Sequence, residues 1–481
     1  MNLREYAGHD GLGLADLVRR KEVAPKELAG LALEGIEKVN GELNAVLESF
    51  SGEVAGLRLE DIPEGAFRGV PFLIKDLVLT RKGTRQESGS ALAKGFVADH
   101  DSELMVRFRR AGLVTLGRTA TPELGLSCTT ECRHTGAAHN PWDTSRMTGG
   151  SSGGSVAAVA AGAVPIAHAN DGGGSIRNPA SCCGLVGLKP SRGRVPAGPD
   201  YGDLLNGLGV EFAVTRTLRD CAALFDAVQG PALGDPYVVP APERPYLEEL
   251  ARDPGRLRIA FTGVPWSGVP VDAEVVEAVE RTAAIAEQMG HAVTEASPEL
   301  DWPFFMDATF DLWCAYVTHA VDAIAGALDR VPSEANLQHT IWACYRYGQG
   351  LSAEDLLRTL DALNVVCRSV APFFQDHDIL MTPTCALVPQ PLGTYDADAP
   401  ELDARGWNDH LFSFDPFLPL FNATGQPAIS LPLHESREGL PLGVQLVARC
   451  YDEATLFRLG ARLEEALPWR DRRPGVHVAA G

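Results

Sequence analysis

The chain has 481 residues, of which 45% are hydrophobic and 22% charged, and its formal net charge is −21 at pH 7. These proportions are typical of globular proteins and exclude collagen-like, coiled-coil and disordered classes. So acidic a chain repels phosphate backbones, and we therefore expect no nucleic-acid partner.

The sequence carries no segment typical of membrane insertion or export. Its longest apolar run, Val156 to Ala167, has 12 residues, whereas a membrane-spanning helix needs about 18 or more. The N-terminus has early charges and no apolar core, so we expect no secretory signal and no membrane partner. The 10 cysteines are too sparse for a disulfide scaffold, and we expect reduced thiols in a cytoplasmic protein.

The first half of the chain predicts a helix followed by strands around a Gly-rich loop. In chain order we expect a helix over 28–39 ended by Asn40-Gly41, a buried strand over 69–79 around Lys75, a Gly- and Ser-rich stretch over 148–155, an Ala-rich run over 156–163 and a short strand over 164–169.

The second half predicts a strand–helix–strand unit, a helical stretch and three further strands. We expect a strand over 256–263, a helix with Val276, Val279, Ala283 and Ala286 on one face, a strand over 291–296, helices over 300–375, strands over 379–382, 428–433 and 442–448, and a helix over 454–467. A strand–helix–strand unit implies some parallel sheet. Length alone suggests about three domains, but no linker divides the chain, so we predict one large α/β domain.

Two Gly-rich segments carry the strongest chemical signal. Gly149–Gly154 contains Ser151 and Ser152, and residues 171–175 read Asp-Gly-Gly-Gly-Ser. Glycines allow consecutive backbone N–H groups to approach a ligand closely. Such a nest suits an oxyanion that forms beside a nucleophilic hydroxyl.

Other interpretations of these segments fit less well. A phosphate loop needs a lysine after the glycines, and a dinucleotide fingerprint needs a strand before them; both are missing. The pattern Gly149-x-Ser151-x-Gly153 matches the nucleophile elbow of α/β-hydrolases, which stays a minor alternative because the segment before it, with Pro141, is a poor strand. No metal is expected, because four potential ligands are spaced more tightly than in usual zinc sites: Cys128, Cys132, His134 and His139.

With these motifs the chain resembles the amidase signature family. Ser175 follows Ser151 by 24 residues, in Asp-Gly-Gly-Gly-Ser-Ile-Arg, and Lys75-Asp76 lies upstream. Matching segments also begin at Phe421 and Gly443, so the resemblance covers nearly the whole chain. Within the family, residues 167–194 are similar to the branch that contains 6-aminohexanoate cyclic-dimer hydrolase. Where the family pattern has a small residue, this chain has Val156.

The resemblance implies one amidase-signature domain over 1–481, with a mixed β-sheet core covered by helices on both faces. Its core signature would span about 69–195, and a variable substrate-binding region about 300–420. The implied activity is cleavage of the carboxamide C–N bond of a small linear or cyclic amide through a serine acyl-enzyme. The partner is then a small-molecule amide, and self-association as a homodimer stays open.

The resemblance also assigns a Ser-cisSer-Lys triad to Ser175, Ser151 and Lys75. A serine hydroxyl needs a base to become a nucleophile, and a lysine is a base only when neutral. Lowering a lysine pKa from about 10.4 to about 7 costs on the order of 4–5 kcal/mol, and the apolar flanks 72–74 and 77–79 favour that by desolvation. The remaining expected site residues are the oxyanion hole of Gly172, Gly173 and Gly174 and the supporting Asp171, Arg177 and Ser152.

No metal or organic cofactor is expected. Two alternatives from different classes remain: the A subunit of a glutamine-dependent tRNA amidotransferase, which shares the triad, and a catalytically silent binding protein on the same fold. Six aromatic residues are expected either to pack in the core or to line an apolar pocket: Trp302, Phe304, Phe305, Phe310, Trp313 and Trp342.

Overall fold

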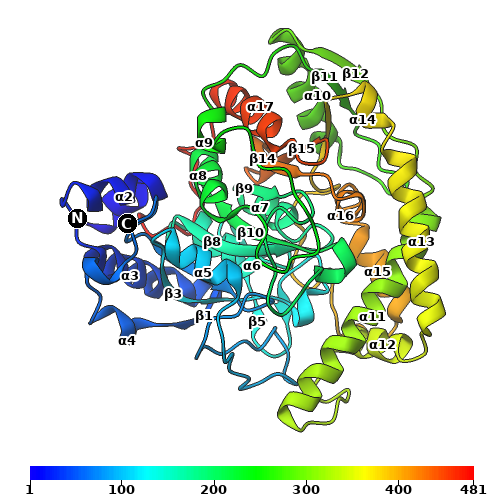
Figure 1. Cartoon of the computed structure of the whole chain (residues 1–481), viewed down its shortest axis with the longest axis horizontal. Helices are drawn as coiled ribbons and strands as arrows, with labels where there is room; N and C mark the ends of the chain where they lie inside the picture. The colour runs from blue at the N-terminus through cyan, green and yellow to red at the C-terminus, as the bar shows by residue number, and fades with distance from the viewer. Residues whose placement is uncertain (481) are drawn as a thin grey trace.

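A mixed sheet of eleven strands runs through the molecule, with helices packed on both of its faces (Figure 1). A computed structural model describes residues 1–480. The strands, in spatial order, are β1 (Val46–Ser49), β3 (Val114–Thr119), β2 (Pro71–Lys75), β8 (Ile166–Asp171), β10 (Val210–Thr215), β9 (Val186–Lys189), β14 (Ala428–Glu435), β15 (Pro441–Ala448), β13 (Ile379–Pro383), β11 (Arg258–Phe261) and β12 (Ala292–Glu295). The expected α/β class with a mixed sheet is confirmed.

Two small two-stranded sheets lie outside this main sheet. They pair β4 (Glu131–Cys132) with β5 (Gly136–Ala137), and β6 (His139–Asn140) with β7 (Asp143–Met147). The N-terminal helices are α1 (Leu3–Gly8), α2 (Gly11–Arg19), α3 (Pro25–Leu43), α4 (Ser51–Val54) and α5 (Glu103–Arg110). Lys38 of α3 donates to the carbonyl of Val478 (3.1 Å), so the two ends of the chain meet on one side of the molecule (Figure 1).

The helices of the central and C-terminal parts complete the layers. They are α6 (Gly153–Ala160), α7 (Arg177–Cys183), α8 (Leu218–Val228), α9 (Tyr246–Glu249), α10 (Ala273–Gln288), α11 (Trp302–Leu328), α12 (His339–Gly348), α13 (Ala353–Val370), α14 (Phe373–Asp376), α15 (Ala404–Phe412), α16 (Pro419–Thr424) and α17 (Glu453–Ala466). Figure 1 shows α11, α12 and α13 along one flank of the molecule. Among residues 1–480, no helix is long and apolar enough to cross a membrane.

The parallel pair β2 and β8 determines where chemistry can occur. Phe72 of β2 lies opposite Ile166 of β8, and both strands run in the same direction. Their carboxyl ends, Lys75 and Asp171, therefore reach the same edge of the sheet. In α/β sheets this edge is where ligands bind.

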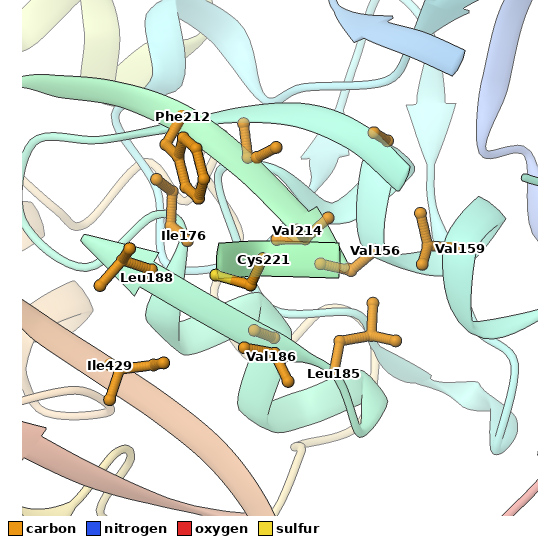
Figure 2. Close-up of a cluster of buried hydrophobic side chains, with 14 of the residues drawn as sticks. Val156, Val159, Ile176, Leu185, Val186, Leu188, Phe212, Val214, Cys221 and Ile429 are labelled. Atoms are coloured by element: carbon orange, nitrogen blue, oxygen red, sulfur yellow. The ribbon is translucent and has the colours of Figure 1, made fainter. Parts of the chain in front are cut away.

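A cluster of buried hydrophobic side chains packs next to the loop that carries Ser175 (Figure 2). Val156 of α6, Val186 of β9 and Phe212 of β10 have no exposed surface. Ile176, the residue after Ser175, packs into the same cluster (Figure 2). The loop that carries Ser175 is thereby fixed at its C-terminal side by apolar packing.

Most expected elements are present, and several of their boundaries are shifted by a few residues. The strand–helix–strand unit is confirmed, because β11 and β12 are parallel and α10 connects them. The first expected helix does not stop at Asn40-Gly41: α3 continues to Leu43, and Asn44 ends it with a left-handed φ of 47°. The strand at Lys75 ends at that residue instead of at 79, since Val78 has φ of 68°. The strand expected to end at 169 continues to Asp171.

Gly154 allows α6 to lie directly on the neighbouring backbone. A Cβ at this position would approach the Ala120 nitrogen to 2.3 Å and the Ala45 carbonyl oxygen to 2.5 Å. Backbone atoms cannot move aside as a flexible side chain can. Small residues at the start of α6 are therefore required by close packing, as the Ala-rich sequence predicts.

We predict that Gly154→Ala destabilises the protein by about 1–3 kcal/mol or more, because the added methyl group overlaps backbone atoms. Gly30→Ala in α3 is the matched control: that position is exposed and has no atom within 4 Å of a new Cβ. Alanine there should stabilise the helix by about 0.5–1 kcal/mol. Thermal unfolding of both variants checks the prediction, and equal shifts in Tm would contradict it.

Candidate active site

The end of β2 and two loops meet at the carboxyl edge of β2 and β8. Lys75 is the last residue of β2, and residues 171–175 leave the end of β8. The loop 148–152 enters α6 and contains a cis peptide bond between Gly150 and Ser151. The structure thus brings the three residues of the expected triad to one place, although they are 76 and 24 residues apart in sequence.

Lys75 is buried among hydroxyl and amide groups. Its Nζ lies 2.7 Å from Ser151 Oγ, 3.0 Å from Ser152 Oγ and 2.5 Å from Asn170 Oδ1. The residue is 1% exposed. Burial lowers the pKa of Lys75 to about 7, against the opposing charges of Glu211 and Asp171. An amine with this pKa is neutral in a large fraction of molecules at physiological pH.

Ser175 and Ser151, the hydroxyl partner of this amine, line one small cavity. Ser151, Ser175 and Gly172 all line the cavity, whose volume is about 30 Å³, enough for water or the carbonyl end of a substrate. Ser152 Oγ donates to the carbonyl oxygen of Ser175 (2.6 Å), which fixes the backbone of the loop. Ser175 itself is partly exposed.

In the described part of the chain, three backbone N–H groups of the glycine loop have no protein acceptor, whereas the N–H of Gly174, an expected donor to the oxyanion, has one. Within residues 1–480, the amides of Gly172, Gly173 and Ser175 donate to no protein group. The amide of Gly174 donates to Asp171 Oδ1 (2.7 Å). Our expectation that Gly174 contributes to an oxyanion hole is therefore corrected, because the side chain of Asp171 occupies its N–H.

A buried ion pair lies beneath this loop. Arg177 is fully buried and donates to both carboxylate oxygens of Asp171, at 2.9 Å through Nε and 3.0 Å through Nη2. It also donates to Gln445 Oε1 (2.7 Å) and Asn422 Oδ1 (2.6 Å). Burial raises the pKa of Asp171, but the charge and hydrogen bonds of Arg177 outweigh burial and hold it at about 2.

The aromatic residues divide between the core and the site. Of the six singled out from the sequence, only Trp313 lines the cavity with the serines. Phe305 and Phe310 are buried in the core, whereas Phe304 is 40% exposed. Trp302 stacks edge-on against Phe305, outside the cavity. Trp342 packs against Tyr345 of the same helix, α12.

The alternative sites do not form. His139 Nδ1 lies 2.7 Å from the carbonyl of Thr144, and the Cys132 thiol donates to the carbonyl of Gly89. No three His, Cys, Asp or Glu side chains gather around a common point in residues 1–480. The strand before Ser151 is β7, which pairs with β6 in a small sheet outside the main sheet. Ser151 therefore does not follow a strand of the main sheet, as the serine of a nucleophile elbow does.

Four residues that contribute to the site were missed in the sequence. Asn170 contacts Lys75, Tyr316 of α11 lines the cavity, and Asn422 and Gln445 bind Arg177. Asn422 and Gln445 lie in the two C-terminal segments that carry the family resemblance. Gln445 is a polar residue inside the otherwise apolar strand β15, and this is a sequence signal by which a buried polar partner can be found.

Comparison with known proteins gives a consistent result. The family model described as Amidase matches residues 27–457. The chain is 36% identical over 476 residues to a 6-aminohexanoate-cyclic-dimer hydrolase of Pseudomonas sp. (strain NK87), covering 97% of this chain and 96% of that protein. It is also 36% identical over 477 residues to the protein of that name from Paenarthrobacter ureafaciens, with the same coverage. A solved structure of 6-aminohexanoate cyclic dimer hydrolase superposes with a TM-score of 0.92 at 35% identity, covering 98% of this chain and 99% of that one.

We predict that Arg177→Met destabilises the protein by about 3–5 kcal/mol, because it leaves the Asp171 carboxylate buried without a partner. The measurement is the free energy of unfolding in denaturant. Adding Asp171→Leu to the same chain should recover part of the loss, since both buried charges are then removed.

Arg358→Met is the matched control for that change. Arg358 is 69% exposed and pairs with Asp355 on the surface of α13 at 2.9 Å. Exposed ion pairs contribute about 0–1 kcal/mol, so this variant should unfold almost like the parent. Equal losses for Arg177→Met and Arg358→Met would show that the buried pair is not a special determinant of stability.

Proposed function

The chain belongs to the amidase family, hydrolases that act on carbon–nitrogen bonds other than peptide bonds, and we propose that it cleaves small linear or cyclic amides through an acyl-enzyme on Ser175. One observation carries this proposal. A buried lysine amine with a pKa near 7 lies 2.7 Å from the hydroxyl of Ser151, and Ser151 lines the same cavity as Ser175.

Neutral Lys75 accepts the proton of Ser151, and Ser151 accepts the proton of Ser175 as that hydroxyl attacks the amide carbonyl. The carbonyl oxygen becomes an oxyanion, to which the amides of Gly172, Gly173 and Ser175 donate. The relay then runs backward: Lys75 returns its proton through Ser151 to the leaving nitrogen. The C–N bond breaks, and the amine departs.

Hydrolysis of the ester on Ser175 repeats the same steps with water. The relay removes a proton from water, the oxyanion forms again in the loop, and the proton returns to Ser175 as the acid departs. Asp171, held ionised by Arg177, keeps the loop in the geometry that presents its N–H groups. The hydroxyl of Ser152 donates a hydrogen bond to the backbone carbonyl of Ser175 and so holds the loop in place.

The substrate class rests on the relatives. Two proteins that are 36% identical over nearly the whole chain are named for a cyclic dimer of 6-aminohexanoate, a small amide. The cavity beside Ser175 is small, which favours compact groups over folded polypeptides. A panel of primary amides, anilides, short aminoacyl amides and cyclic amides tests this class, and hydrolysis confined to glutamine would favour the amidotransferase alternative.

We predict that a fluorophosphonate probe labels Ser175, because its hydroxyl is the one activated toward electrophiles. Mass spectrometry of the digested protein locates the label. Ser175→Ala should lose both the label and amide hydrolysis, whereas Ser369→Ala in α13, whose hydroxyl bonds only within its own helix, should keep both. A label on Ser151, with Ser175→Ala still active, would overturn the assignment and favour the elbow hypothesis.

We predict that kcat/KM for amides falls about tenfold per pH unit below about 7 as Lys75 gains a proton and stops acting as a base. Lys75→Ala should lose about 10²–10⁴ in kcat/KM. The control is Lys189→Met: burial also lowers the pKa of Lys189 to about 7, but its Nζ bonds only the carbonyl of Pro190. If that variant loses the acidic limb of the profile, Lys75 is not the base.

A further inference from the structure

A second cavity adjoins the catalytic one. Its volume is about 350 Å³, within the range of sites for small ligands. Four side chains line both cavities, and we call this junction the neck: Leu77, Val78, Leu124 and Tyr316. We call this second cavity the outer chamber. Nothing in the proposed hydrolysis of the carbonyl itself uses it.

One face of α11 forms the long wall of the outer chamber. Tyr316 lies at the neck, and Ala320, Ala323 and Ala327 follow on the same face. The eleven residue steps from Tyr316 to Ala327 rise by about 16 Å at 1.5 Å per residue. Beyond Tyr316 the wall consists of three alanines, Ile324 and one polar side chain, His319, so it is long and mostly apolar.

The neck lies on the side of Ser151. A Cβ on Gly125 would lie 2.6 Å from Leu77 Cδ2 and 3.4 Å from Ser151 Oγ, so this serine adjoins the wall of the neck. The glycine loop is closed on its other side: a Cβ on Gly172 would lie 2.7 Å from Leu205 and 2.8 Å from Trp313. Little room is left there for a long acyl group.

We propose that the outer chamber binds the amine-side arm of the substrate, a slender apolar chain, while the acyl group is short. The inference rests on the proposed function, in which Ser151 returns the proton to the leaving nitrogen. That nitrogen must lie next to Ser151 and therefore next to the neck. Its substituent then extends through the neck along α11.

The charged groups in the lining of the chamber determine which chain ends it accepts. His100 lies between two carboxylates, 2.7 Å from Asp99 and 3.0 Å from Asp200. The lining holds these two acids and no lysine or arginine. Two carboxylates and the imidazoles of His100 and His319 therefore line the chamber, and its net charge is negative unless both imidazoles are protonated. Arms that end in a methyl, amide or ammonium group fit, and arms that end in a carboxylate are disfavoured.

Two series of amides test the assignment. In the first, acetyl is constant and the amine is a straight chain from ethyl to dodecyl; in the second, methylamine is constant and the acyl chain lengthens. We expect kcat/KM to rise about two- to fourfold per methylene in the first series until the chamber is full, and to stay flat or fall in the second. A rise with acyl length alone would overturn the inference while leaving amide hydrolysis intact.

Variants along α11 locate the arm. Ala320→Trp should abolish the gain from longer amines, whereas Ala327→Trp, about 10 Å farther along the helix, should affect only the longest. Both variants should label with fluorophosphonate at Ser175 at the parent rate, since neither residue lines the catalytic cavity. Unchanged length profiles in both variants would overturn the inference. Failure of every amide with Ser175 unlabelled would instead refute the proposed function.

Discussion

The buried pair of Asp171 and Arg177 is the interaction on which the site depends. The carboxylate of Asp171 accepts hydrogen bonds from the backbone N–H groups of Gly174 and Ile176, and so fixes the loop on both sides of Ser175. Arg177 holds that carboxylate in turn and connects it with β15 and α16 through Gln445 and Asn422. A glycine-rich loop has little conformational preference of its own. Its geometry here is determined by the buried ion pair of Asp171 and Arg177.

Lys75 and Asp171 illustrate how similarly buried surroundings can leave one ionisable side chain charged and another neutral. Both side chains are almost fully buried. Asp171 has a guanidinium partner and stays ionised, whereas Lys75 has neutral hydroxyl and amide neighbours and gives up its proton readily. A carboxylate in contact with Lys75 would have kept it charged. Because Asp171 bonds Arg177, and the hydrogen-bond partners of Lys75 are neutral, a neutral lysine is compatible with a charged residue in the neighbouring loop.

The sequence predicted the residues that gather at this edge better than the contacts that hold them in place. The resemblance to the amidase signature family assigned Lys75, Ser151 and Ser175, and parallel β2 and β8 bring the ends of their strands to one edge of the sheet. Asn422 and Gln445 contact Arg177 across 245 and 268 residues, and no local pattern reports such a distance. Local sequence also did not predict that the N–H of Gly174 donates to the side chain of Asp171. Nor did it predict which of the six aromatic residues lines the cavity, which is Trp313.

The burial of Lys75 also affects folding. In the unfolded chain this amine titrates near its ordinary value of 10.5, but in the folded protein near 7. Between these values the unfolded state binds a proton that the folded state does not, so stability increases with pH across that window. At pH 7 the linkage opposes folding by on the order of 5 kcal/mol. Burial of Lys75 thus lowers the free energy of unfolding near pH 7, where this amine begins to be neutral. At mildly alkaline pH the fraction of neutral Lys75 and the free energy of unfolding both increase.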